Sequence, residues 1–142
     1  PYQDLEDLPY SLAAADLALV TLSIEAEGLV APSKLYGHLA AGTPIAAITP
    51  PDCYLREMVE QEHCGRWFAN GNAEDLAAWI CELKKNPAAA RSIGEASRSL
   101  LQRTATPELV SADYLKLIEE HLPKPFGKVV TAADQPSVKL TP

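Results

Sequence analysis

The fold is decided by the apolar run Leu17-Ala18-Leu19-Val20-Thr21-Leu22 and by Glu27-Gly28-Leu29-Val30-Ala31-Pro32-Ser33-Lys34, which follows it after four residues. The first run has the length and composition of a buried strand. The second leads into a helix that we expect over residues 35–41. Gly42 with Pro44 beyond it is typical of a helix C-terminus. This stretch therefore predicts a strand, a loop and a helix in that order.

The predicted loop carries residues that suit a nucleotide-sugar. Ligands of open α/β sheets bind at the carboxyl ends of the strands, and the N–H groups of a helix N-terminus suit phosphate. Gly28 allows close approach of a ligand to the backbone, and Lys34 supplies a cation in the first helical turn. Glu27 would repel a bare phosphate, but its carboxylate suits hydroxyl groups. The combination predicts a site for a nucleotide-sugar.

Length and composition indicate one soluble globular domain. The chain has 142 residues, of which 47% are apolar and 22% charged. Its net charge of −7 argues against a nucleic-acid partner. No signal peptide is visible, and the longest apolar stretch, residues 12–24, is short for a membrane span and contains Asp16. We expect a cytoplasmic protein that could meet the inner face of a membrane only through parts outside this sequence.

The cysteines favour a reducing compartment. Cys53, Cys64 and Cys81 are scattered and include no Cys-x-x-Cys pair. Such a set predicts buried free thiols in place of disulfides or zinc, and no metal site is expected.

Three apolar runs, over residues 17–22, 45–49 and 65–69, alternate with helical patterns. Strands that alternate with helices predict a parallel sheet, and continuous apolar runs suit strands covered on both faces. The predicted fold class is α/β, a partial Rossmann-like sheet of about three strands with flanking helices. Because no strand precedes Leu17, the first strand would have an unpaired edge, and we expect the chain to self-associate there.

Three consecutive helices are predicted after the last strand. Asn72 is a cap for the first, Asn86-Pro87 begins the second, and Thr106-Pro107 begins the third. We expect residues 1–121 to form one domain, the C-terminal half of a Rossmann-like unit, and residues 122–142 to be a flexible tail with Pro and Lys residues. The predicted buried positions are Leu76, Trp79, Ile80 and Leu83 of the first helix, and Val110, Tyr114, Leu117 and Ile118 of the third.

Several motifs follow one another in order along the chain. They are Leu8-Pro9-Tyr10, Ala14-Ala15-Asp16, Glu27-Gly28, Pro32-Ser33-Lys34, residues 39–44, Cys64-Gly65, residues 70–76, and Asn86-Pro87 with Ile93-Gly94. With these motifs, between about Leu5 and Glu120, the chain resembles the C-terminal domain of family 4 glycosyltransferases of the GT-B fold. The Pro-Ser-Lys sequence looks most like transferases that build bacterial cell-surface polysaccharides.

The resemblance implies an enzyme with two Rossmann-like domains that transfers a sugar with retention at the anomeric carbon. It implies no metal and no cofactor beyond the nucleotide-diphosphate-sugar donor. Glu27 would face the donor-sugar hydroxyls, and the backbone of Gly28, Leu29 and Val30 would approach the sugar and diphosphate. Ser33 and Lys34 would lie near the phosphates. An N-terminal domain outside this sequence would bind the acceptor, so the 142 residues alone are expected to be an inactive fragment.

The sequence departs from the family pattern at Gly37, where the resemblance places a second glutamate that holds the ribose. Two other readings therefore stay open. One is a non-catalytic nucleotide-sugar-binding or protein-interaction module, and the other is a nucleotide-sugar epimerase of similar fold. Among the remaining candidates, Tyr36 and Trp67 are expected to pack in the core, and His38 is expected to be a packed or surface residue.

Overall fold

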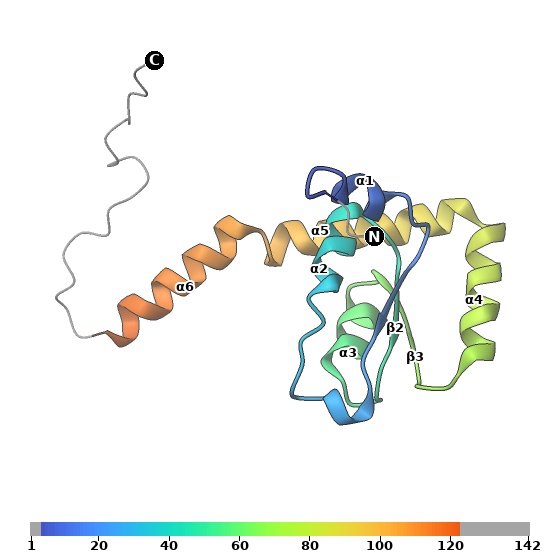
Figure 1. The fold of residues 1–142 in the computed structure, drawn as a ribbon, viewed down its shortest axis with the longest axis horizontal. Helices are drawn as coiled ribbons and strands as arrows, with labels where there is room; N and C mark the ends of the chain where they lie inside the picture. Colours follow the sequence, from blue (N-terminus) through green and yellow to red (C-terminus); the bar gives the residue numbers. More distant parts are fainter. Residues whose placement is uncertain (1–3, 123–142) are drawn as a thin grey trace, which may run out of the picture.

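The structure is a computed structural model and describes residues 4–122 of the chain. Its centre is a three-stranded parallel sheet in the order β1 (Ala18–Thr21), β2 (Ile45–Ile48), β3 (Gly65–Phe68) (Figure 1). The register places Ala18 beside Ile45, and Ile45 beside Gly65. The predicted α/β class and the three parallel strands are confirmed.

Helices join the strands and then follow them. The predicted capping residues are confirmed, because Asn72, Asn86 and Thr106 accept hydrogen bonds from the backbone N–H groups of Asp75, Ala89 and Leu109. The helices are α1 (Leu8–Ala13), a 3₁₀ turn η1 (Ile24–Ala26), α2 (Lys34–Ala41), α3 (Tyr54–Gln61), α4 (Ala73–Lys85), α5 (Pro87–Thr104) and α6 (Pro107–His121).

The sheet is packed on both faces, but unequally. On one face, Val20 and Ala47 contact α2 and α3. On the other, Ala46 and Phe68 contact α4, where the rings of Phe68 and Trp79 lie 5.6 Å apart. Leu19 of β1 points to this second face and is 54% exposed. The expectation of two covered faces is wrong for β1, because the cluster under α4 is built on β2 and β3 and does not include Leu19.

Helix α5 closes the amino ends of β2 and β3. The buried Ser97 hydroxyl lies 3.0 Å from the carbonyl oxygens of both Thr43 and Cys64. Thr43 lies two residues before β2, and Cys64 directly precedes β3. One turn earlier, Gly94 packs against the backbone of Gly42, which ends α2 in the left-handed conformation at φ +72°. The contact joins α2, the two strand starts and α5 into one unit.

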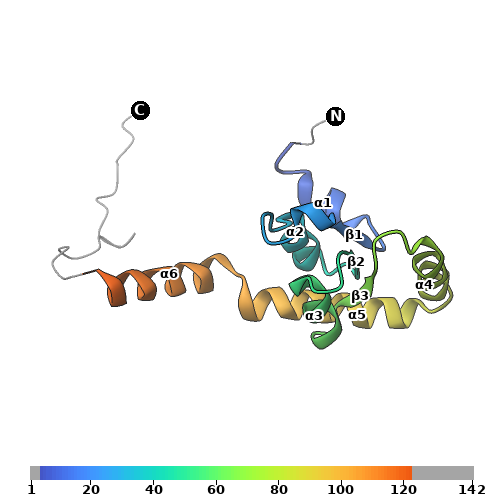
Figure 2. The same cartoon turned by 90° about the horizontal axis from the view of Figure 1, so that it is seen from below.

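Helix α6 projects away from the rest of the molecule in both views (Figures 1 and 2). The predicted buried face of Val110, Tyr114, Leu117 and Ile118 is wrong, since these side chains are exposed. The residues have the predicted helical spacing, but within residues 4–122 no buried position is found on α6.

Three smaller expectations need correction. Tyr36 and Ile80 are exposed, because each lies on the outer side of its helix.

Cys53 and Cys64 are buried free thiols as predicted, whereas Cys81 is exposed. Burial raises the pKa of Cys64 to about 11, which keeps this thiol protonated at neutral pH. Trp67 packs against the core and donates a hydrogen bond to Thr49. Residues 123–142 of the predicted tail lie outside the described residues.

Replacing Gly94 with alanine tests the helix–turn contact. Alanine ordinarily stabilises a helix interior by about 1 kcal/mol relative to glycine. Here a Cβ would overlap the carbonyl oxygen of Gly42, so we expect Gly94→Ala to lower the free energy of unfolding by about 1–3 kcal/mol. Ser92→Ala, at an exposed position of the same helix, is the control and should cost nothing. Urea unfolding of both variants measures the difference, and equal stabilities would contradict the close contact.

We predict that the chain self-associates through the edge of β1 that no strand among residues 4–122 pairs, and that a charge on this strand reduces the association. The N–H groups of Ala18 and Leu22 donate toward β2, so those of Leu19 and Thr21 face the open edge. We expect concentration-dependent dimers or larger species in analytical ultracentrifugation, and a shift to monomer in Leu19→Lys. Leu117→Lys on α6 is the control for the other exposed apolar surface. A monomeric wild type, or a loss of association only in Leu117→Lys, would contradict the edge as the interface.

Candidate functional site

The loop between β1 and α2 lies at the carboxyl end of the sheet, where it meets the start of α3. A cavity of about 480 Å³ opens between them. Its walls come from the end of β1, from the loop and from the two residues at the start of α3. The lining residues are Leu22, Glu27, Gly28, Leu29, Val30, Ala31, Cys53 and Tyr54.

The loop is held by backbone hydrogen bonds and by one long-range side chain. The N–H groups of Leu29 and Val30 both donate to Ala26 at 3.1 Å. The Asn70 side-chain amide, beyond β3, donates to the Leu22 carbonyl at 3.0 Å and so ties the ends of the two outer strands together. Gly28 has φ +72°, and a Cβ on it would meet no heavy atom within 4 Å. Gly28 therefore presents open backbone at the cavity.

The start of α2 offers fewer free N–H groups than a regular helix. Ser33 is the N-cap residue, but its side chain makes no capping bond. The N–H groups of Leu35 and Tyr36 already donate to Pro32 and Ser33 at 3.1 and 3.2 Å. In the described part of the chain, this leaves the N–H groups of Ser33 and Lys34 for a ligand.

The structure brings together four of the six predicted site residues. Glu27, Gly28, Leu29 and Val30 line the cavity, with Glu27 half-buried and Leu29 82% exposed. Ser33 and Lys34 are exposed at the start of α2 and do not line it. A ligand would have to extend beyond the cavity to reach them.

The charged groups near the loop can be assigned ionisation states. Hydrogen bonds from its own backbone N–H and from Ser23 lower the pKa of Glu25. Burial, and then the nearby Lys34 ammonium, lower the pKa of His38, which is therefore neutral at pH 7. The Nδ1 atom of His38 is buried and has no partner among the described residues.

Residues 4–122 contain no group of three His, Cys, Asp or Glu side chains that could hold a metal ion. Over the same residues, no helix has the length and apolar character needed to cross a membrane.

At Gly37, where the resemblance places a ribose-binding glutamate, α1 and α2 pack closely together. Gly37 lies where α1 crosses α2, and a Cβ on it would stand 3.1 Å from Leu12 Cδ1. A side chain there would press on the end of the Leu12 side chain, which would have to shift. The glycine is thus explained by the close approach of the two helices.

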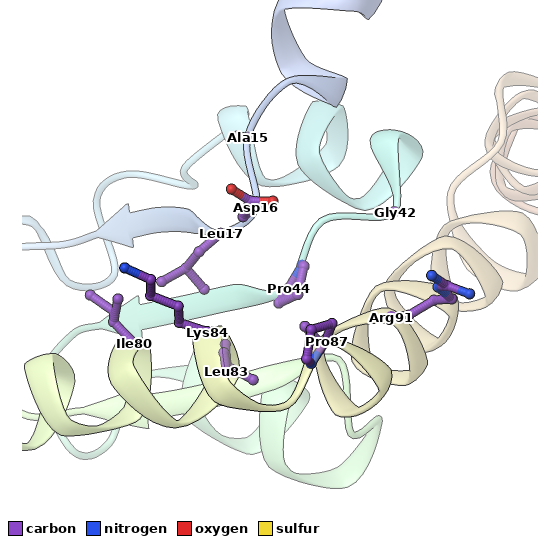
Figure 3. Close-up of a pocket in the computed structure, with 11 residues that line it drawn as sticks. Ala15, Asp16, Leu17, Gly42, Pro44, Ile80, Leu83, Lys84, Pro87 and Arg91 are labelled. Carbon is purple, nitrogen blue, oxygen red and sulfur yellow. The ribbon is translucent and has the colours of Figure 1, made fainter.

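A larger cavity, of about 610 Å³, lies at the opposite end of the sheet between the strand starts and the α4–α5 corner (Figure 3). Its floor is largely apolar, with Leu17, Pro44 and Leu83 among the lining residues. Asp16, Lys84 and Arg91 carry its charges, and Figure 3 shows Arg91 pointing away along α5. None of the predicted site residues lies here.

Comparison with known proteins decides the family. Residues 1–100 match the family described as Glycosyl transferases group 1, which is more than half of the chain. The chain belongs to this family. The matched residues include the whole sheet, the loop and the cavity at the carboxyl end.

The group 1 chain is also similar to the probable glycosyltransferase WbjE of Pseudomonas aeruginosa, with 34% identity over 103 residues. That alignment covers 70% of this chain and 24% of WbjE, so the chain spans about a quarter of the length of this relative. No solved structure matches the chain.

Three residues of the candidate site were not predicted from the sequence. Cys53 and Tyr54 line the cavity, and Asn70 holds the loop. A helical pattern was expected between the second and third strands, but the bounds of α3, which positions the first two of these residues, were not predicted. The signal was present, because Leu55 and Val59 are spaced by one helical turn after a Pro-Pro-Asp turn at residues 50–52.

Proposed function

We propose that this chain is the donor-binding part of a glycosyltransferase, and that the cavity at the carboxyl end of the sheet receives the sugar of a nucleotide-sugar. One observation carries the proposal. Glu27 and the open backbone of Gly28 share a single cavity, beside the start of α2, in a chain of the group 1 family. The chemistry of these groups suits a sugar joined to a diphosphate.

Each part of the donor has a group suited to it. The Glu27 carboxylate can accept hydrogen bonds from sugar hydroxyls and stabilise positive charge at the anomeric carbon as the bond to the diphosphate breaks. The free N–H groups of Ser33 and Lys34, with the Lys34 ammonium, suit the departing diphosphate. In this arrangement the sugar lies in the cavity and the phosphates lie outside it, toward α2.

The wider proposal follows the family resemblance. We propose a retaining transfer that uses neither metal nor cofactor, by a cytoplasmic enzyme that builds cell-surface polysaccharide, at the inner face of the membrane if other parts bring it there. The acceptor would bind to a domain outside these 142 residues. The probable glycosyltransferase WbjE, which is about four times as long as the matched segment, supports a larger parent enzyme.

A non-catalytic nucleotide-sugar-binding or protein-interaction module is the second candidate, and the packing at Gly37 favours it. The position expected to hold a ribose carboxylate is covered by Leu12 of α1. A chain without a carboxylate to hold the ribose could bind a nucleotide-sugar without transferring its sugar. An assay for transfer by the polypeptide that carries this chain separates the two candidates.

Glu27→Gln should lower turnover more than it weakens nucleotide binding. The substitution keeps the size of the side chain and removes the charge that is assigned to the sugar. In the polypeptide that carries this chain, we expect kcat to fall about 10²–10³-fold. The affinity for nucleoside diphosphate, measured by calorimetry, should stay within about twofold. Glu25→Gln, two residues away, is the control, and wild-type turnover by the Glu27 variant would refute the assignment.

Lys34→Ala should weaken binding of a nucleoside diphosphate about tenfold and leave a free nucleoside unaffected. The reason is that a charge-assisted contact to phosphate contributes roughly 1.5–3 kcal/mol when formed, and less at an exposed position such as this one. Calorimetry at two salt concentrations measures both ligands. Equal losses for nucleoside and diphosphate would mean that Lys34 acts through the structure of α2 and not through its charge.

A further inference from the structure

Tyr54 lines the cavity, and the proposed function gives it no role. Tyr54 is the first residue of α3 and lines the cavity together with Glu27 and Gly28. It comes from a different element than the loop, because α3 follows β2 and the loop follows β1. The Tyr54 side chain is 49% exposed, so its ring is not part of the core.

The walls of the cavity indicate which part of a donor Tyr54 would meet. Apart from Glu27, the lining side chains are aliphatic, aromatic or thiol groups, and none of them is a cation. Such walls offer no cation to neutralise a diphosphate. A sugar ring, with hydroxyls at its rim and C–H groups on its faces, suits one carboxylate together with an aromatic ring.

We propose that Tyr54 is a specificity-determining residue that packs its ring against the donor sugar, in the same cavity as Glu27. The proposal rests on the proposed function. A tyrosine phenol is protonated at neutral pH, and burial, then Tyr36 and Cys53 nearby, raise the pKa of Tyr54 further. The hydroxyl can therefore donate a hydrogen bond to a sugar oxygen as well as accept one.

Tyr36 provides a matched control for this role. It lies in the first turn of α2, close enough to affect the pKa of Tyr54, and is 48% exposed. It does not line the cavity. Tyr36 and Tyr54 thus share residue type, exposure and neighbourhood, and differ in access to the proposed sugar position.

The experiment measures affinities of the 142-residue chain for UDP, GDP, UDP-glucose and GDP-mannose by calorimetry. We expect Tyr54→Ala to weaken the nucleotide-sugar that binds wild type by about three- to tenfold and to leave its nucleoside diphosphate unchanged. Tyr54→Phe should recover most of the loss, because it restores the ring. Tyr36→Ala should change neither affinity. Circular dichroism checks that each variant is folded.

The outcomes separate this inference from the proposed function. If wild type binds a nucleotide-sugar and Tyr54→Ala binds it equally well, or if Tyr36→Ala loses as much, the role of Tyr54 is refuted and the donor site stands. If wild type binds none of the four compounds, while the longer polypeptide also fails to bind them, the donor site itself is refuted.

Discussion

The contact of α5 with the turn at Gly42 is the constraint on which the rest of the structure depends. Ser97 reaches the carbonyl oxygens that precede β2 and β3, and Gly94 lets the helix backbone touch that of Gly42. Both contacts lie at the amino ends of the strands. They hold α2, β2 and β3 in one register, so that the loop after β1 and the start of α3 meet at the opposite end.

The two cavities described above lie at opposite ends of the sheet. The larger one lies beside α5 at the amino end, where apolar side chains are joined by Asp16, Lys84 and Arg91, whereas the smaller one contains Glu27 and open backbone at Gly28. Volume alone would select the first. Chemistry favours the second, because ligands of open α/β sheets bind beyond the carboxyl ends of the strands, where loops rather than packed helices supply the side chains.

Sequence patterns predicted what depends on local chemistry. The strands, the capping residues Asn72, Asn86 and Thr106, and the end of α2 at Gly42 all follow from neighbouring residues. Properties that depend on distant partners were missed. The helical spacing in α6 was read correctly, but spacing does not say whether a partner covers the apolar side. Tyr36 was expected to pack in the core as an aromatic residue, but it is exposed. Tyr54 lines the site because the sheet places α3 beside the loop, a juxtaposition that no local pattern indicates.

The most direct test of the account is to map where a nucleoside diphosphate and its sugar conjugate bind on the 142-residue chain by NMR chemical-shift perturbation. The account predicts that a nucleoside diphosphate shifts the amides of Ser33 and Lys34, and that the sugar conjugate adds shifts at Glu27, Gly28 and Tyr54. Shifts gathered instead at Leu17, Lys84 and Arg91, around the cavity beside α5, would contradict it.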